Sequence, residues 1–218
     1  MGLHLNYELR LPGDATVDEV CRQLGELHRR ALEFPFTRVS NVAAAADPGD
    51  DWMHSALGLF ARIIVEVFDE EYPPFTGDAS TAIGFLIDVG SRCEPATFAF
   101  LQRAGADGTN GEWFWHCSCK TQYASVVSDE HLVTCHTSLV ALLDHAIACG
   151  IDVVVRDETH YWETRDTARL IAEVHKMNQI VAAFAGRFSD AVESGRPLRV
   201  EGSIFDHPRF ERLEMGDE

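Results

Sequence analysis

The hydrophobic pattern of the chain changes its period near residue 128, and this change constrains the fold more than any other feature. Between residues 83 and 123 the apolar side chains come in short runs bounded by glycine, proline and polar residues, which predicts strands. From Asp129 to Cys149 they recur every three or four positions, which predicts a helix, and Gly150 is the residue type that commonly follows a helix end. The chain therefore combines a sheet with separate helices.

The strand-like half of the sequence predicts an antiparallel meander. Ile83–Val89, Pro95–Gln102 and Glu112–Tyr123 follow one another, and the glycine-rich stretch 104–111 connects the last two. Ile151–Val155 is an apolar run broken only by Asp152, close to the pattern of a strand covered on both faces. Further strands are expected at 3–11, at 36–42 and at 59–68, with a buried helix as the alternative for the last segment.

Three main helices are expected around this sheet. Thr16 and Glu19 form a capping box before an apolar stripe that runs to Ala31. The second helix is the one at 129–149, and the third begins after Thr164 or Asp166 and runs to about Phe188. We therefore predict a single α+β domain over residues 1–218, a largely antiparallel sheet flanked by about three main helices, with residues 195–218 as an irregular charged tail.

The charge balance restricts the partners that the chain is expected to bind. It has 35 acidic against 18 basic side chains, a formal net charge of −17, and so is expected to repel nucleic acid. This charge favours solubility, with a docking face for a basic protein as the alternative. Neither an apolar run of roughly 20 residues nor a basic segment followed by an apolar one is visible, which predicts a cytoplasmic protein without membrane contact.

The densest group of aromatic and reactive side chains is Trp-Phe-Trp-His-Cys-Ser-Cys at residues 113–119. On a strand, Trp113, Trp115, Cys117 and Cys119 share one face. A zinc site that joins Cys117 and Cys119 to Cys135 and His136 is one interpretation. The C-x-C spacing and the place of Cys135 on a helical stripe favour core packing instead, so neither a metal nor another cofactor is expected.

Cysteine nucleophile chemistry is a further possibility in this region. A reactive thiolate needs a nearby base or cation. The residues of the right type are His116, His131, His136 and Lys120, and the sequence does not choose among them.

A second cluster lies between the apolar run at 151–155 and the last helix. Strand-to-helix loops of this kind commonly hold ligands, and carboxylates, imidazole and aromatic rings can bind or act as acids and bases. The alternative is a solvated acidic turn anchored by its two aromatic residues. Together with the end of the preceding strand, the candidate ligand-binding residues are Lys120, Gln122, Tyr123, Asp157, Glu158, His160, Tyr161, Trp162, Glu163 and Arg165.

Three stretches of the C-terminal half carry a resemblance to other proteins. Residues 119–125, 135–139 and 157–166 resemble segments of an uncharacterised bacterial protein family with no assigned activity. The resemblance implies membership of such a group and transfers no catalytic residue.

The sequence contains no P-loop, no GxGxxG after a strand, no HExxH and no GxSxG. We therefore expect a soluble, non-catalytic small-molecule-binding or regulatory protein, with a pocket between the strand end at 120–123 and the loop at 157–165. One alternative is a hydrolase or lyase that uses Glu158, His160 or Glu163 as acid or base. Another is a homo-oligomeric structural or interaction protein that pairs through a sheet edge or an aromatic patch.

Overall fold

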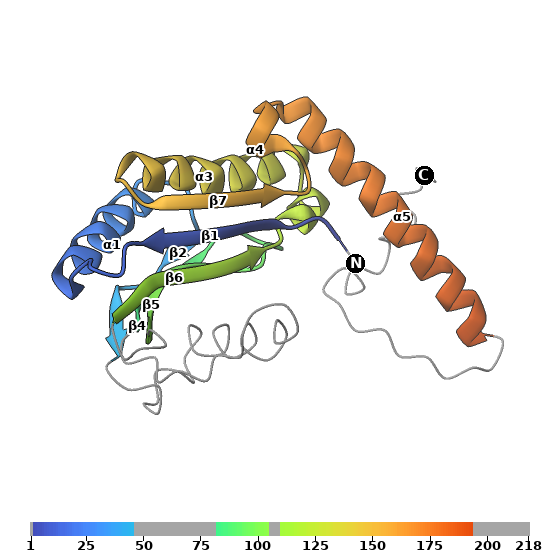
Figure 1. Cartoon of the computed structure of the whole chain (residues 1–218). Coiled ribbons are helices and arrows are strands. Elements are labelled where there is room, and N and C mark those ends of the chain that lie inside the picture. The colour runs from blue at the N-terminus through green and yellow to red at the C-terminus, as the bar shows by residue number, and fades with distance from the viewer. Residues whose placement is uncertain (1, 46–81, 105–109, 194–218) are drawn as a thin grey trace.

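The computed structural model describes residues 2–45, 82–104 and 110–193, and it confirms the predicted α+β class (Figure 1). The described strands form one sheet in the order β2-β4-β5-β6-β1-β7, in which β3 also pairs with β4, and the pairings are antiparallel. The strands are β1 (Leu5–Leu11), β2 (Arg38–Val39), β3 (Ala43–Ala45), β4 (Ala82–Asp88), β5 (Ala96–Ala104), β6 (Asn110–Cys119) and β7 (Asp152–Asp157).

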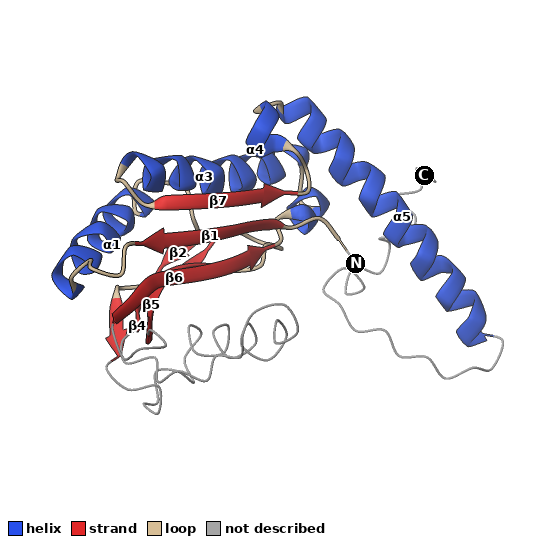
Figure 2. Ribbon diagram, in the orientation of Figure 1, coloured by secondary structure: helices blue, strands red, loops and turns tan. Residues whose placement is uncertain are grey.

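Helices cover one face of this sheet (Figure 2). The helical elements are α1 (Val17–Ala31), the 3-10 turn η2 (Gln122–Val126), α3 (Asp129–Ala148), the single turn α4 (Tyr161–Thr164) and α5 (Thr167–Glu193). The α1 and α3 helices pack beside each other on the sheet. The α5 helix follows α4 and extends away from the sheet (Figure 1). In the described part of the chain, no helix is long and apolar enough to cross a membrane.

The predicted N-terminal caps of α1 and α5 and the predicted glycine after α3 are confirmed, whereas α5 runs to Glu193 rather than to about Phe188. Thr16 Oγ1 accepts a hydrogen bond from the backbone N–H of Glu19 at the start of α1, and Ser128 Oγ accepts one from the N–H of His131 at the start of α3. Gly150, just after α3, has φ of 86°, a conformation that glycine adopts without the steric penalty of a side chain. At α5 it is Asp166 that caps, accepting from the N–H groups of Ala168 and Arg169.

The core lies between the sheet and the helices. The predicted face of β6 is confirmed, because Trp113, Trp115, Cys117 and Cys119 are all buried. Beside it on β1, Tyr7 stacks on Phe98 of β5 with ring centroids 5.2 Å apart. The Tyr7 hydroxyl and the Trp115 indole N–H both donate to the carbonyl oxygen of Thr97, at 2.8 and 2.9 Å, so these large side chains pack without losing their hydrogen bonds.

Two predictions for the second half of the sheet are wrong. The β7 strand is not an interior strand covered on both faces: it pairs with β1 at the edge of the sheet, and Val154 is 49% exposed. The predicted strand end at 120–123 is not extended either, since β6 ends at Cys119 and the backbone turns into η2. Of the strand expected at 36–42, the structure has only β2 at Arg38–Val39, and β3 forms just beyond it at Ala43–Ala45. The strand predicted at 59–68 and the tail at 195–218 lie outside the described residues.

Candidate functional site

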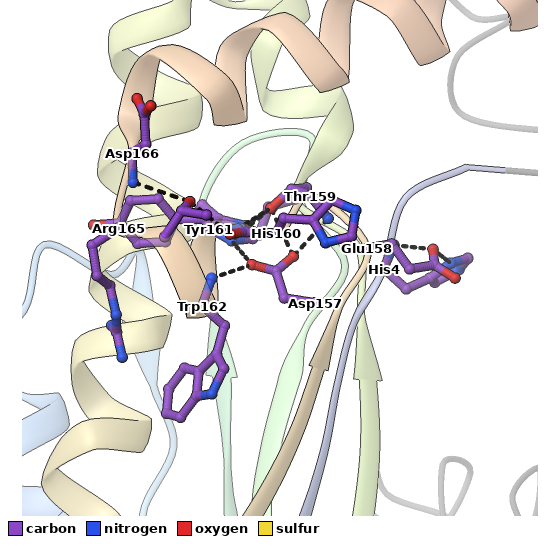
Figure 3. Close-up of polar contacts among 12 residues, drawn as sticks. His4, Asp157, Glu158, Thr159, His160, Tyr161, Trp162, Arg165 and Asp166 are labelled. Atoms are coloured by element: carbon purple, nitrogen blue, oxygen red, sulfur yellow. Dashed lines mark hydrogen bonds and ion pairs between the residues drawn. The ribbon is translucent and has the colours of Figure 1, made fainter.

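The loop after β7 is built around one carboxylate. Asp157 ends the strand, and its Oδ1 accepts hydrogen bonds from the backbone N–H and the hydroxyl of Thr159, at 2.9 and 2.7 Å. Its Oδ2 accepts from the backbone N–H of Trp162 at 2.8 Å (Figure 3). These bonds close the turn and fix the start of α4, so Asp157 organises the loop from inside the protein.

His136 joins this carboxylate to the segment after β6. From the middle of α3, its Nε2 lies 3.1 Å from Asp157 Oδ2, and its Nδ1 lies 2.8 Å from the hydroxyl of Thr121. All three residues are buried. Thr121 and Asp157, which are 36 positions apart in the sequence, therefore contact the same imidazole ring.

The order hydroxyl, imidazole, carboxylate is that of a nucleophilic triad, but here it is a closed internal network. Both nitrogens of His136 have partners, and the Tyr161 ring packs edge-on against the imidazole with centroids 5.5 Å apart. Burial by itself would raise the pKa of Asp157, but the hydrogen bonds from His136 and Thr159 outweigh it and lower that pKa to about 2. The carboxylate therefore stays charged although it is buried.

Lys120 lies just outside this network. Its side chain is only 11% exposed, and its Nζ is 3.7 Å from Glu94 Oε1 and 5.5 Å from the centre of the Tyr123 ring. The backbone N–H of Lys120 donates to the other oxygen of Glu94 at 3.0 Å, which fixes the carboxylate in place. The ammonium and Glu94 thus form an ion pair that is longer than a hydrogen bond.

Gln122 has a structural place next to Lys120. Its Oε1 accepts from the backbone N–H of Leu3 at 2.7 Å, and its Nε2 donates to Asn178 of α5 at 2.6 Å. This buried amide ties η2 to the start of β1 and to α5. Tyr123 is half-buried against Met177 and Val181 of α5, and burial raises the pKa of its hydroxyl.

The remaining candidate residues divide into two groups on opposite sides of Asp157 (Figure 3). On one side, Glu158 accepts from the backbone N–H of His4 at 2.8 Å. On the other side, Arg165 pairs with both oxygens of Asp144, at 2.9 and 2.7 Å, and its guanidinium lies 4.5 Å from the centre of the Trp162 ring. The cation therefore covers the aromatic surface that the sequence suggested for stacking.

The single turn α4 carries the last candidates. His160 and Arg165 flank it with φ of 61° and 53°, a left-handed conformation that is uncommon outside glycine. His160 and Glu163 are exposed, while Tyr161 and Trp162 are half-buried against the core. Sequence reasoning missed Thr121, Glu94 and the role of His136, because each matters through a contact with a residue far along the chain.

The zinc alternative finds no support in the described residues. No group of three or more His, Cys, Asp or Glu side chains there could hold a metal ion. Cys117 and Cys119 pack in the core, and the Cys119 thiol donates to the carbonyl oxygen of Glu94 at 3.2 Å. Cys135 contacts His131 of its own helix rather than the two cysteines of β6.

Comparison with known proteins adds no family or activity: no family model, curated protein or solved structure matches the chain. The chemistry of the residues around Lys120 and Asp157 is therefore the basis for assigning a function.

Proposed function

We propose that this protein is a non-catalytic binding or regulatory protein that holds a small molecule through the ammonium of Lys120. The observation that carries the proposal is the environment of that group: the side chain is 11% exposed, and its ammonium is held by an ion pair with Glu94 at 3.7 Å, longer than a hydrogen bond. An ammonium held only by a long ion pair can still donate charge-assisted hydrogen bonds. A ligand that places an acceptor at hydrogen-bond distance from Nζ therefore gains free energy from binding there.

The surroundings of Lys120 favour a small carboxylate as this ligand. A single carboxylate can share the ammonium with Glu94, which lies 3.7 Å away, and the Tyr123 ring at 5.5 Å offers a flat apolar surface to the rest of the molecule. Glu94, whose side chain is 45% exposed, can accept from an amine on the same ligand. Multiply charged phosphates are disfavoured, because Glu94 lies close by and the whole chain carries a net charge of −17.

The same residues support binding over catalysis. His136 is buried together with its partners Thr121 and Asp157. The acid–base candidates Glu158, His160 and Glu163 are exposed, and Glu158 already accepts from the backbone N–H of His4. A hydrolase or lyase would need one of these groups to be placed differently.

Thermal unfolding tests the proposal, because a ligand that binds the native state raises the melting temperature. The probes are monocarboxylates, dicarboxylates and α-amino acids, each beside its neutral amide, with inorganic phosphate as the multiply charged comparison. At about 100 times its Kd, a ligand adds about 2.7 kcal/mol of stability. In a chain of this length that is a rise of about 5–10 °C.

A pair of lysine variants makes this test specific. Lys120→Met keeps the length of the side chain and removes its charge, so we expect it to abolish the stabilisation by the carboxylate. Lys176→Met is the matched control, since Lys176 lies on α5 with its side chain 71% exposed. If no carboxylate stabilises the protein, or if Lys120→Met is stabilised as strongly as the parent chain, the proposal is wrong. Equal stabilisation by phosphate would overturn the ligand class.

A second candidate function is self-association through the edge of the sheet, and it rests on the sequence of β7. If β7 pairs with the β7 of a second copy antiparallel around Val154, Asp152 of each copy lies opposite Arg156 of the other. The exposed Val154 side chains then meet at the two-fold axis. The strand is thus complementary to itself in charge and in register.

A further inference from the structure

The side chain of Lys120 is flanked by two neighbours, an aromatic ring and a stretch of backbone. The ring is that of Tyr123, whose centre is 5.5 Å from Nζ. The backbone is that of Gly2: a Cβ added there would stand 2.9 Å from Lys120 Cε and 3.3 Å from Nζ. Both neighbours are held in place by contacts that lead to α5.

Tyr123 packs against α5 in a small apolar cluster. Its partners in this cluster, which is separate from the main core, are Val126, Met177, Val181 and Ala182. Earlier in the same helix, Leu170 and Val174 belong to the main core. The α5 helix is therefore attached at two places, and the second attachment is the one at η2.

Asn178 of α5 fixes the backbone neighbour. It is completely buried; its Oδ1 accepts from Gln122 Nε2 at 2.6 Å, and its Nδ2 donates to Ser125 Oγ at 2.9 Å. Gln122 Oε1 in turn accepts from the backbone N–H of Leu3 at 2.7 Å, next to the glycine that lies against the lysine. A chain of hydrogen bonds thus runs from α5 to the backbone beside the ammonium.

The contact between α5 and η2 is small. Its buried apolar members are Val181 and Ala182, and its polar part is the side chain of Asn178. Contacts of this size open locally at a lower free-energy cost than unfolding of the whole chain. When the helix undocks here, Tyr123 and Gln122 lose their partners on α5 together, so both neighbours of the lysine are released.

We propose that docking of the second half of α5 on η2 controls the Lys120 site. The docked helix holds the two neighbours of Lys120 in place, and undocking exposes the ammonium. The importance of this control for ligand binding rests on the function proposed above, whereas the control itself is a property of the ligand-free protein. Because coupling between two equilibria is reciprocal, a ligand held by Lys120 stabilises the docked helix as much as docking strengthens binding.

The chain has two lysines, which allows a direct test without any ligand. Lys120 is 11% exposed, and Lys176 of α5 is 71% exposed. The folded protein receives a limiting amount of the N-hydroxysuccinimide ester of acetic acid, which acetylates amines. Mass spectrometry of chymotryptic peptides then gives the rate at each lysine. In the parent chain Lys120 should react more slowly than Lys176.

Two variants loosen the docking and leave the lysines unchanged. Asn178→Leu removes the hydrogen bonds from α5 to η2, and Val181→Ala leaves a space in the apolar cluster. Each should raise the rate at Lys120, relative to the other lysine, at least about fivefold, because the lost contacts increase the population of the undocked state. Ile180→Ala is the matched control: this side chain lies on the same helix, is 48% exposed and should leave the ratio unchanged.

Deuterium uptake in α3 checks that the main core stays folded in each variant, so that faster acetylation is assigned to α5. If Asn178→Leu does not fold, Val181→Ala decides the question alone. An unchanged ratio of the two lysine rates in the folded variants would overturn the proposal.

Benzoate, a carboxylate with a flat ring, tests the coupling to a ligand. It should slow deuterium uptake in the second half of α5, and Lys120→Met should abolish this effect. If benzoate raises the melting temperature but leaves uptake in α5 unchanged, the coupling is wrong and the proposed function stands. If benzoate does not bind while the two α5 variants expose Lys120, control by α5 stands and the choice of a carboxylate ligand fails.

Discussion

Nε2 of His136 and Oδ2 of Asp157 lie 3.1 Å apart, and both side chains are almost completely excluded from solvent. The contact fastens the middle of α3 to the end of β7, where the loop that leads to α4 and α5 begins. Removing His136 takes one hydrogen-bond partner from a buried carboxylate that water solvates poorly. The stability of the fold and the position of the loop therefore depend on the same contact.

A double-mutant cycle measures this dependence. His136→Leu should lower the free energy of unfolding by about 1–3 kcal/mol, because the buried Asp157 carboxylate loses one hydrogen-bond partner while those from Thr159 and Trp162 remain. Asp157→Asn should cost about 2 kcal/mol through its weakened hydrogen bonds. The double variant should cost less than the sum, with a coupling of about 1 kcal/mol or more in urea unfolding. Strict additivity would show that the two side chains act separately.

The low pKa of Asp157 predicts how stability changes in acid. Its value of about 2 in the folded chain lies below the ordinary 3.8, so its contribution is complete above about pH 4 and is lost as the pH falls towards 2. The loss amounts to about 2 kcal/mol. Urea unfolding between pH 5 and pH 2 should show a smaller fall for Asp157→Asn than for the parent chain. Parallel curves for the two proteins would contradict the prediction.

Two glycines offer a matched pair of alanine substitutions. Gly90→Ala should destabilise the protein by about 1–3 kcal/mol, because the new Cβ would stand 2.5 Å from Cys135 Sγ. Gly25→Ala should stabilise it by about 0.5–1 kcal/mol, since Gly25 lies within α1 and nothing is within 4 Å of a Cβ there. Chemical denaturation measures both. If Gly90→Ala is neutral, the loop is less closely packed than described.

The charges of β7 allow a test of self-association by exchange. Asp152→Arg places arginine opposite arginine across the proposed two-fold axis, and Arg156→Asp places aspartate opposite aspartate, so each should weaken pairing. The double variant restores opposite charges and should restore association. Sedimentation velocity over a concentration series measures the outcome. A monomeric parent chain, or the same dimer in all four proteins, would remove the second candidate function.

Local signals in the sequence correctly predicted most of the fold. The capping residues Thr16 and Asp166 and the apolar stripes behind them depend on neighbours close along the chain, and the alternation along β6 depends only on the pleat of a strand. These features do not require knowledge of distant residues. The two main helices on the sheet and the aromatic face of β6 were predictable for that reason.

The errors arose where long-range packing decides the outcome. The valines of β7 form an apolar run, yet the strand lies at an edge, because which strands pair is settled by the whole sheet. At the candidate site, Lys120 and the loop at 157–165 were anticipated, whereas the bonds from His136 to Thr121 and Asp157 were not. No periodicity marks a histidine whose two partners lie 15 and 21 residues away.

The left-handed backbone at His160 determines which substitution can remove its side chain without disturbing the loop. Glycine adopts that conformation without steric cost, so His160→Gly is expected to leave the bend before α4 in place. Since the imidazole is exposed, such a replacement separates the contribution of the backbone from that of the ring. If His160→Gly has an unchanged melting temperature but has lost a binding activity, that loss is due to the imidazole ring.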